Sequence, residues 1–437
     1  MSRFRHGQQA FIFCYYVSGH GWGHATRVNQ IATELLRHPA GHTVYIISDA
    51  SDFIFQRVIC LGAQYRHALI DSGVIQTLPY VIDGPNTIAG VESFMKKRAE
   101  ILREEASWLK SVRCDIVLCD APFVPCAAAA KAGIPSALVT NFTFDEIYWK
   151  LREGNSSLNM RINNLVDQMI SDYSHSALLV RLPGYINIPA FENAPSISSD
   201  DYLSNNEAEH ITRKKCIIDV PLVVRKGQSP RDEVWFAIGI PPKIYTTHKI
   251  LLLQFGGQVL SKDAWGDNPL PDGWICVFCG DPPSASLPSR FFRAPKDAYI
   301  PDLINAADVL LGKLGYGSCS EAIAHCKPLV YVPRPQFKEE EGLLVLMRNH
   351  GLPVEMPREQ FESGEWGKYI LQAAELKKKD PVPDNGGEIA ARVLEKWVGV
   401  QKMKSLDNGE SQLNTMIAEN DRERVNGAIL PPISTAQ

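Results

Sequence analysis

Two histidines, His20 and His24, lie in the glycine-rich segment Ser-Gly-His-Gly-Trp-Gly-His-Ala at residues 18–25, directly after the apolar run 11–17. An apolar run followed by glycines is typical of a buried strand that turns into a helix, and open α/β sheets bind their ligands at such turns. Imidazole groups accept and donate protons near neutral pH. The segment therefore indicates an enzyme site in which a histidine moves a proton.

Other interpretations of this segment fit its spacing to different degrees. A dinucleotide-binding G-x-G-x-x-G motif requires a third glycine where His24 stands, which disfavours a nicotinamide cofactor. The i, i+4 spacing of His20 and His24 suits a metal pair, but no further cluster with metal-ligand spacing accompanies them, so we expect no metal. A tight turn whose histidines only cap the next helix stays open as an alternative, and partners elsewhere in the chain must decide.

A second candidate site is the segment Gly-Lys-Leu-Gly-Tyr-Gly-Ser-Cys-Ser-Glu at residues 312–321, between a strand-like run and a helix. Gly315 and Gly317 let backbone N–H groups approach a ligand, and Ser318 is expected to open the helix as its cap. The helix N-terminus and the charge of Lys313 both favour a phosphate. The segment lacks the Gly-Lys-Ser/Thr ending of a Walker loop, and taken alone it also fits a simple turn.

An acidic cluster that contains Glu339 and Glu340 begins the next helical stretch. Acidic residues at a helix start complement the helix dipole, which explains the cluster without any ligand. In a crevice, the same carboxylates accept hydrogen bonds from sugar hydroxyls. The position of the cluster after the phosphate-like segment favours this second use.

These residues need a scaffold, and the N-terminal half alternates strand-like and helix-like segments. Strands are expected at 11–17, 43–48, 65–70, 115–119 and 136–140, with helices around 24–37, 52–60, 90–111 and 123–132 between them. Such alternation predicts an α/β fold with a parallel, doubly wound sheet. With the common strand order 3-2-1-4-5, the first and fourth strands are neighbours, and the loops that carry His24 and Asp120 face each other across one crevice.

A second alternating pattern starts near residue 249, so we expect two Rossmann-like domains. Strands are expected at 249–255, 274–278, 308–311 and 329–332, with helices near 301–307, 318–326 and 340–350. The predicted organisation is an N-terminal domain over 1–225 with a flexible polar insertion at 192–216, a linker over 226–248, a C-terminal domain over 249–402 and a loose polar tail over 403–437. An amphipathic helix over 387–398 is expected to close the second domain.

The composition excludes several classes of protein. The 437 residues are 45% hydrophobic and 22% charged, and the net charge of −4 provides no basic surface for nucleic acid. The apolar runs are far shorter than the roughly 20 residues of a membrane span, and no secretory leader is present, so a cytoplasmic location is expected. Cys276 and Cys279 have metal-site spacing, but they lie within one apolar strand, which favours core packing.

Five longer segments resemble one family of proteins. They are residues 18–28, Arg181–Tyr185, Asp219–Arg225, Phe255–Gln258 and Gly312–Gly317. These segments resemble GT-B glycosyltransferases, and more closely the glycosyltransferase-like N-terminal region of plant L-arabinokinases and fungal glycosyltransferases that decorate terpenoids. The resemblance covers nearly the whole chain except 192–216 and the tail. It implies two Rossmann-like domains that face a central cleft, and the absence of a sugar-kinase phosphate loop disfavours kinase activity.

The resemblance also implies an activity. The chain is expected to move a sugar from a nucleotide-sugar donor to a hydroxyl of a small lipophilic acceptor, in particular a terpenoid, with inversion at the anomeric carbon. His24 is the expected general base, Asp120 orients it, and His20 is the alternative base. The nucleotide sugar is a co-substrate, and no cofactor is expected. Two rival functions stay open: a sugar-nucleotide-binding module without catalysis, and a sugar-nucleotide epimerase or hydrolase.

Binding residues follow from the same resemblance. Lys313 stands where the family has a phosphate-binding histidine, and Glu339 and Glu340 stand where it has an Asp-Gln sugar pair. The expected donor-binding residues are Gly256, Gly257, Tyr299, Lys313, Gly315, Gly317, Ser318, Glu321, Glu339 and Glu340. Aromatic residues that follow the fifth strand suit an apolar acceptor slot, and each of them equally fits simple packing on the face between the domains. The expected acceptor-binding residues are Gln76, Phe142, Phe144 and Trp149.

Overall fold

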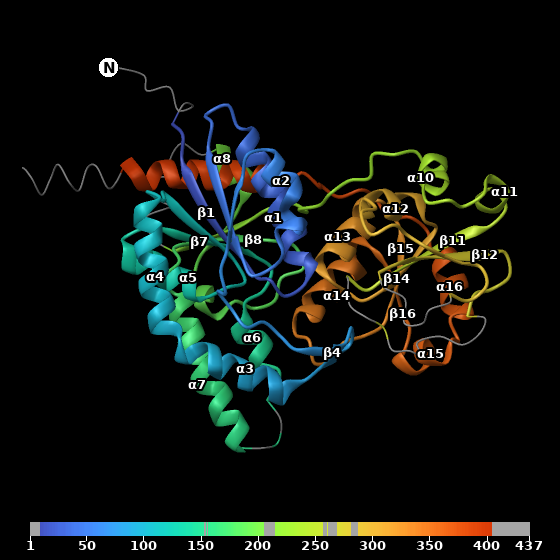
Figure 1. Ribbon diagram of the computed structural model, residues 1–437, viewed down its shortest axis with the longest axis horizontal. Coiled ribbons are helices and arrows are strands. Elements are labelled where there is room, and N and C mark those ends of the chain that lie inside the picture. The colour runs from blue at the N-terminus through green and yellow to red at the C-terminus, as the bar shows by residue number, and fades with distance from the viewer. Residues whose placement is uncertain are drawn as a thin grey trace, which may run out of the picture.

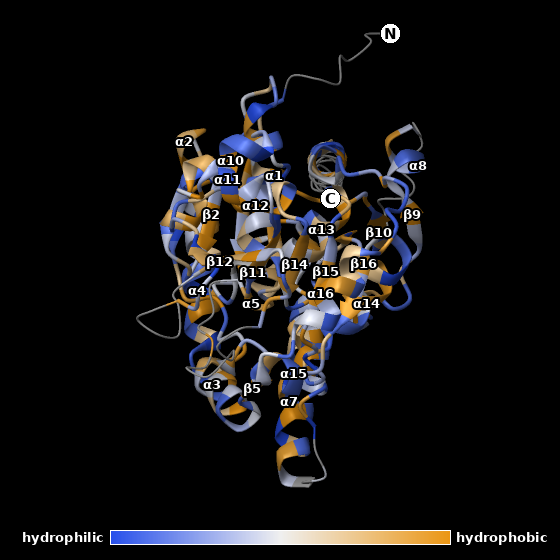
Figure 2. Ribbon diagram, turned by 90° about the vertical axis from the view of Figure 1, so that its right-hand side faces the viewer, coloured by the Kyte–Doolittle hydropathy of each residue, from blue (hydrophilic) through white to orange (hydrophobic). Residues whose placement is uncertain are grey.

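A computed structural model describes residues 9–152, 154, 156–204, 215–256, 260, 269–280 and 287–403. These residues form two parallel β-sheets with helices packed against them, which lie side by side (Figure 1). Figure 2 shows hydrophobic residues along the strands of both sheets. Parallel sheets are covered on both faces and therefore need continuous apolar strands, which is the pattern that the sequence has in these runs. The predicted α/β class with two Rossmann-like sheets is confirmed.

The first sheet has eight parallel strands. In spatial order they are β3 (Gln64–His67), β2 (Thr43–Ser48), β1 (Ile12–Val17), β6 (Ile116–Asp120), β7 (Ser136–Thr140), β8 (Leu178–Arg181), β10 (Cys216–Asp219) and β9 (Ser196–Ser198). The first five follow the predicted order, and β1 pairs with β6 so that Val17 lies opposite Asp120. This pairing brings the ends of the two strands to one point of the sheet edge.

Helices cover both faces of the first sheet. They are α1 (Trp22–Arg37), α2 (Gln56–Cys60), α3 (Gly84–Lys96), α4 (Arg98–Ser111), α5 (Val124–Ala132), α6 (Phe144–Trp149), α7 (Ser156–Tyr173) and α8 (Ser199–Ser204), with 3-10 turns at Asp52–Phe55 and Pro189–Phe191. Successive side chains of a strand point to opposite faces. Accordingly Phe13 and Tyr15 pack in one core with Val28 of α1, whereas Cys14 and Tyr16 pack in another with residues of α3, α4 and α5.

The second sheet has six parallel strands. In spatial order they are β13 (Phe291–Arg293), β12 (Trp274–Cys279), β11 (Lys249–Gln254), β14 (Val309–Gly312), β15 (Pro328–Tyr331) and β16 (Leu352–Glu355). Its helices are α12 (Ile300–Ala306), α13 (Tyr316–Ala324), α14 (Glu339–His350), α15 (Arg358–Ser363) and α16 (Gly367–Ala374). Gly312 is required at the end of β14, because a Cβ there would lie 2.2 Å from the carbonyl oxygen of Gln254. The ends of β11 and β14 are therefore in close contact.

Two segments for which the sequence predicted no helix or strand contain such elements. Within the predicted insertion 192–216, β9 pairs in parallel with β10, and Tyr202 of α8 is fully buried. Within the predicted linker 226–248, α10 (Arg231–Ala237) and α11 (Pro242–Tyr245) are helical. Trp235 is fully buried and Arg231 pairs with Asp308 at 2.8 Å, so tertiary packing stabilises helices too short to show a clear period. Residues 205–214 of the insertion lie outside the described residues.

The last described helix, residues 386–403, packs on the first half of the molecule (Figure 1). Glu395 pairs with His38 at 3.2 Å, and Lys402 pairs with Asp115 at 2.5 Å. The prediction that this helix closes the second domain is therefore corrected. Its amphipathic pattern shows that one face is buried but not which sheet buries it. The tail from residue 404 lies outside the described residues.

A hairpin reaches from the first half into the second. It consists of β4 (Gln76–Leu78) and β5 (Val81–Ile82), and Tyr80 at its tip is buried. The Tyr80 ring lies 6.3 Å from that of Phe255 and 6.0 Å from that of Phe361, and its hydroxyl donates to Glu362 at 2.9 Å. The hairpin therefore anchors the loop that follows β3 to the second half.

Candidate active site at the carboxyl ends of the strands

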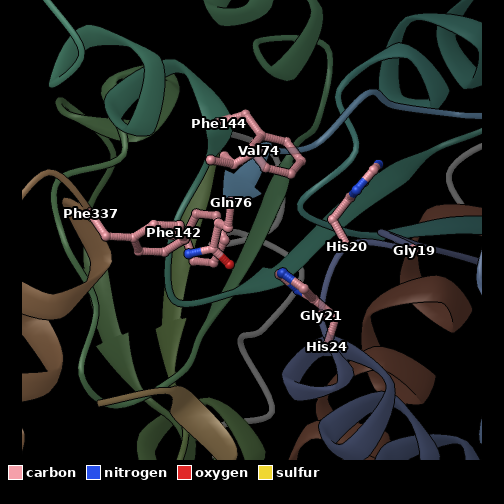
Figure 3. Close-up of a pocket in the computed structure, with 9 residues that line it drawn as sticks. All are labelled: Gly19, His20, Gly21, His24, Val74, Gln76, Phe142, Phe144 and Phe337. Atoms are coloured by element: carbon pink, nitrogen blue, oxygen red, sulfur yellow. The ribbon is translucent and has the colours of Figure 1, made fainter. Parts of the chain in front are cut away.

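A pocket of about 300 Å³ lies at the carboxyl ends of β1 and β7, where ligands of parallel sheets are expected. It is lined by Gly19, His20, Gly21, His24, Val74, Gln76, Phe142, Phe144 and Phe337. Figure 3 shows the two histidines on one side and the three phenylalanines on the other. Phe337, which precedes α14, comes from the second half of the chain. The pocket thus combines titratable groups with an apolar wall contributed by both halves.

His24 and Asp120 meet at this pocket. His24 lies in the first turn of α1, and Asp120 is the last residue of β6. The Nδ1 atom of His24 lies 3.1 Å from Oδ1 of Asp120, and both side chains are buried. The ring of Phe142 lies 5.3 Å from that of His24. The structure therefore brings together the two residues that the sequence placed after neighbouring strands.

Arg27 completes this pair and was not expected from the sequence. Its Nε donates to Asp120 Oδ2 at 2.6 Å, and its Nη2 donates to Asp120 Oδ1. Burial raises the pKa of Asp120, but the Arg27 guanidinium and His24 outweigh burial and hold that pKa at about 2. One feature of the sequence could have revealed it. Arg27 is a charged residue three positions after His24, and it lies next to Val28 and Ile31 on the apolar, buried side of the helix. Asp120 is thus an ionised carboxylate with both oxygens engaged.

His20 forms a second histidine–aspartate pair at the same pocket. Its Nε2 lies 3.3 Å from Oδ1 of Asp71, a buried residue that also accepts from the Ser18 hydroxyl at 3.4 Å. Burial raises the pKa of Asp71, and His20 opposes this effect. Gly73 has φ +54°, and a Cβ there would lie 1.9 Å from Cγ of His20. The ring is therefore confined between Asp71 and the Gly73 backbone.

The phosphate-like segment follows β14 as predicted, with one correction. Helix α13 begins at Tyr316, with Gly315 before it, so Ser318 lies within the first turn and is not the cap. A Cβ on Gly317 would lie 3.3 Å from the Thr26 hydroxyl, so Gly317 allows α13 to approach α1. The helix start thus faces the first half of the molecule.

Lys313 lies between the ends of β14 and β11. Its pKa is lowered to about 7, because burial and the nearby Arg334 together outweigh the opposing effect of Glu339 and Glu340. A Cβ on Gly256 would lie 3.8 Å from Cε of Lys313, so these two predicted donor residues are adjacent. Gly257 lies outside the described residues. The arrangement offers an ammonium group whose charge changes near neutral pH.

The residues expected at the nucleoside are held by arginines. Glu321 accepts from Nε and Nη2 of Arg225 at 2.9 and 2.7 Å. Burial raises the pKa of Glu321, and Arg225 opposes this. Tyr299 lies 5.8 Å from the Arg225 guanidinium, and its hydroxyl accepts from Arg57 at 3.2 Å. Arg57 and Arg225 were not predicted, since no local pattern reveals partners this far away in the sequence.

The two predicted sugar ligands, Glu339 and Glu340, have different surroundings at the start of α14. Glu340 accepts from the Arg334 backbone N–H at 2.7 Å and from its Nε at 3.0 Å. Both of its oxygens are engaged by Arg334 in the loop before the helix. Glu339 instead accepts from Asn141 Nδ2 of the first half at 3.1 Å. Only Glu339 thus reaches across to the base side of the cleft.

The expected acceptor residues divide into two groups. Gln76, Phe142 and Phe144 line the pocket. Trp149 does not line it: its side chain is 44% exposed and its ring stacks on Arg152 at 4.0 Å. It lies at the end of the short helix α6, one turn beyond the residues that face the pocket. Val74 and Phe337 are additional lining residues that the sequence did not indicate.

Within the described part of the chain, one further group has metal-ligand geometry: His38, His42 and Glu395, whose ligand atoms lie within 4.8 Å of one another. Nδ1 of His42 accepts the Phe11 backbone N–H at 3.1 Å, which places the proton of neutral His42 on Nε2, facing Glu395 at 3.6 Å. A metal requires that nitrogen unprotonated. The group is therefore a contact that holds the last helix. Among the described helices, none has the length and apolarity of a membrane span.

No protein-family model matches the sequence. Among characterised proteins, the chain is 38% identical to the L-arabinokinase of Arabidopsis thaliana over 388 residues, which is 88% of this chain and 34% of that protein. The chain thus spans about a third of the length of the relative that it matches. This similarity agrees with the resemblance noted in the sequence motifs.

Solved glycosyltransferases share the fold. The chain is similar to a Polygonum tinctorium UDP-glucosyltransferase capable of glucosylating indoxyl, with TM-score 0.53, 15% identity and coverage of 90% of this chain and 99% of that one. It is similar to UGT89C1 of Arabidopsis thaliana, with TM-score 0.52, 13% identity and coverage of 88% and 94%. It is also similar to CalG4, the calicheamicin glycosyltransferase, with TM-score 0.50, 16% identity and coverage of 93% and 98%. The two parallel sheets therefore form the GT-B glycosyltransferase fold, in a chain whose sequence is related to a third of a plant L-arabinokinase.

Proposed function

We propose that the protein transfers a sugar from a nucleotide-sugar donor to a hydroxyl of a small lipophilic acceptor, with His24 as the general base. The observation that carries this proposal is the buried contact of His24 with Asp120 at a pocket that Phe142, Phe144 and Phe337 line. A hydroxyl becomes an effective nucleophile when its proton is removed as it attacks. The aromatic wall suits a flat apolar molecule, and the resemblance to terpenoid-decorating enzymes extends the proposal to terpenoids.

The reaction follows from the placement of His24. Its Nδ1 lies 3.1 Å from Asp120 Oδ1 and 3.0 Å from Arg27 Nη2, and the base role requires the tautomer in which Nδ1 donates its proton to Asp120, so that Nε2 accepts the proton of the acceptor hydroxyl. The hydroxyl oxygen then forms a bond to the anomeric carbon as the bond from that carbon to the diphosphate oxygen breaks. Asp120 stabilises the imidazolium that results. One displacement of this kind inverts the anomeric centre.

The leaving nucleoside diphosphate needs positive groups near its phosphates. We assign this role to Lys313 and to the backbone N–H groups at the start of α13, next to the loop of Gly256. Glu321 and Tyr299 are assigned to the nucleoside, and Glu339 to the sugar. Glu340 is left out of the sugar site, because Arg334 engages both of its oxygens.

The test is incubation of the protein with radiolabelled UDP-, GDP- and dTDP-sugars, with and without a panel of lipophilic alcohols and phenols. Acceptor-dependent release of the nucleoside diphosphate supports transfer. His24→Ala is expected to abolish transfer and to leave nucleotide binding intact, and retained turnover rejects His24 as the base. His20→Ala in parallel tests the alternative base.

The same assay separates the rival functions. The similarity to part of an L-arabinokinase favours the binding module as the second candidate. Donor binding without turnover in the presence of every acceptor would support that module. Donor that is epimerised or hydrolysed without an acceptor would support the epimerase or hydrolase.

A further inference from the structure

A buried arginine lies where the two halves of the molecule meet. Arg27 comes from α1 and, besides Asp120, donates to Thr140 at 3.1 Å and to Asn141 at 2.5 Å, both at the end of β7. Its guanidinium lies 4.9 Å from the ring of Tyr316, the first residue of α13 in the second half. A buried arginine needs hydrogen-bond partners, and these contacts give one to each of its three nitrogens.

Asn141 continues this set of contacts across the cleft. Its Oδ1 accepts from Arg27, and its Nδ2 donates to Glu339 Oε1 at 3.1 Å. Arginine can only donate and an ionised carboxylate can only accept, so the amide has a single orientation that satisfies both neighbours. Asn141 is fully buried, and hydrogen bonds in such surroundings strengthen one another.

The charges along this path support the same arrangement. Burial lowers the pKa of Arg27, but Asp120 and then Glu339 outweigh it, so the pKa is raised above its ordinary value. The guanidinium is thus paired with Asp120 of the first half and is also stabilised by the charge of Glu339 of the second half, to which Asn141 connects it. Because Asp120 is held by two bonds from Arg27, the carboxylate cannot rotate away from His24.

We propose that Arg27 and Asn141 are positioning residues that fix the distance and orientation between the His24–Asp120 pair of the first half and Glu339 of the second half. The reaction centre is then complete only while the two halves are apposed, since His24 stands on α1 and Glu339 on α14. This proposal rests on the proposed sugar transfer, in which His24 contacts the acceptor and Glu339 the sugar. Arg27 and Asn141 act through those residues.

A swap of donor and acceptor within one bond tests the proposal. In Asn141→Asp, the new carboxylate still accepts from Arg27 but repels Glu339. In the double variant N141D/E339Q, the amide introduced at position 339 donates to the carboxylate introduced at position 141, so the bond is restored in reverse and the net charge equals that of the wild type. Asn164→Asp, an exposed asparagine on α7, is the matched control for the added charge.

We expect kcat of N141D to fall at least about tenfold with the acceptor KM unchanged, since an ångström of misplacement can cost more than this. Because Glu339 is itself assigned to the sugar, the single variant E339Q is the reference, and the kcat of the double variant is expected to lie within about threefold of that of E339Q. Turnover of N141D that equals the wild type overturns the proposal, and so does a loss that the swap fails to restore. If N141D does not fold, Arg27→Lys replaces it, because lysine keeps a charge beside Asp120 but lacks the planar fork with which arginine donates to Asp120 and Asn141 from separate nitrogens.

Hydrogen exchange without substrate separates this proposal from the function on which it rests. Amides of the first turn of α14 and of residues 141–146 are expected to exchange faster in N141D and to regain protection in the double variant. If the wild type transfers no sugar but exchange responds in this way, the proposed sugar transfer is rejected and the positioning role of Arg27 and Asn141 is retained. If sugar transfer occurs but hydrogen exchange is the same in all variants, the positioning role of Arg27 and Asn141 is rejected.

Discussion

Replacement of Arg27 by methionine tests the account of the buried charges most directly. Methionine approximates the apolar stem of the arginine side chain, but it removes the positive partner of Asp120. The carboxylate of Asp120 would then be buried without the guanidinium that pairs with it. Removal of one member of a buried ion pair typically destabilises a protein by about 3–5 kcal/mol, because the other charge is left without compensation.

The pH dependence separates this charge effect from lost packing. The pKa of Asp120 is about 2, against an ordinary value of 3.8, a difference worth about 2 kcal/mol of stability. Because the folded-state pKa is the lower one, this contribution is complete above pH ~4 and is lost as the pH falls toward 2. In R27M, burial raises the pKa of Asp120 instead. The folded variant then bears the free-energy cost of a buried, ionised Asp120 at pH 7, and this cost disappears as the pH falls through the raised pKa and the carboxylate takes up a proton.

The assay is urea unfolding between pH 7 and pH 4, monitored by tryptophan fluorescence. Three tryptophans, Trp235, Trp366 and Trp397, are fully buried and become exposed on unfolding. The gap in unfolding free energy between the wild type and R27M is expected to narrow as the pH falls. The double variant R27M/D120N should recover a large part of the loss at pH 7. A gap that stays constant with pH, together with no recovery in the double variant, would refute the reasoning.

Three further predictions concern other parts of the molecule. The affinity for UDP, measured by calorimetry, is expected to fall as the pH rises from 6 to 8.5, because Lys313 loses its charge near pH 7. Lys313→Met should remove this pH dependence. An equal pH dependence in the wild type and the variant would contradict the assignment of Lys313 to the phosphates. Gly73→Ala should destabilise the protein more than Gly133→Ala in thermal unfolding, since both have positive φ but only the Cβ at 73 would overlap the ring of His20. Tyr80→Ala should cost about 3–5 kcal/mol in urea unfolding and Tyr80→Phe about 1 kcal/mol, and equal losses would show that the hydroxyl, not the ring, holds the hairpin.

The strands and their order could be predicted because each depends on a local pattern. The apolar runs that became β1 and β6 are buried on both faces, and the alternation of strands and helices leaves few ways to connect them. The placement of His24 near Asp120 followed from that order alone. Local patterns did not predict α8 and α10, because these short helices are stabilised by the burial of Tyr202 and Trp235 in the core.

The sequence by itself determined the two Rossmann-like α/β domains, the edge of the sheet where the site lies and the histidines that stand there, since strand periodicity and glycine-rich turns express local burial and backbone geometry; the GT-B family followed from the resemblance of its motifs. Only the tertiary structure decided the partners: Arg27 with Asp120, His20 with Asp71, Glu339 with Asn141, and the last helix with the first sheet. These contacts join residues far apart in the chain or turn a charged side chain into the core. Such choices depend on which buried charges come within hydrogen-bond distance after the strands have paired, and no local period of the sequence carries that information.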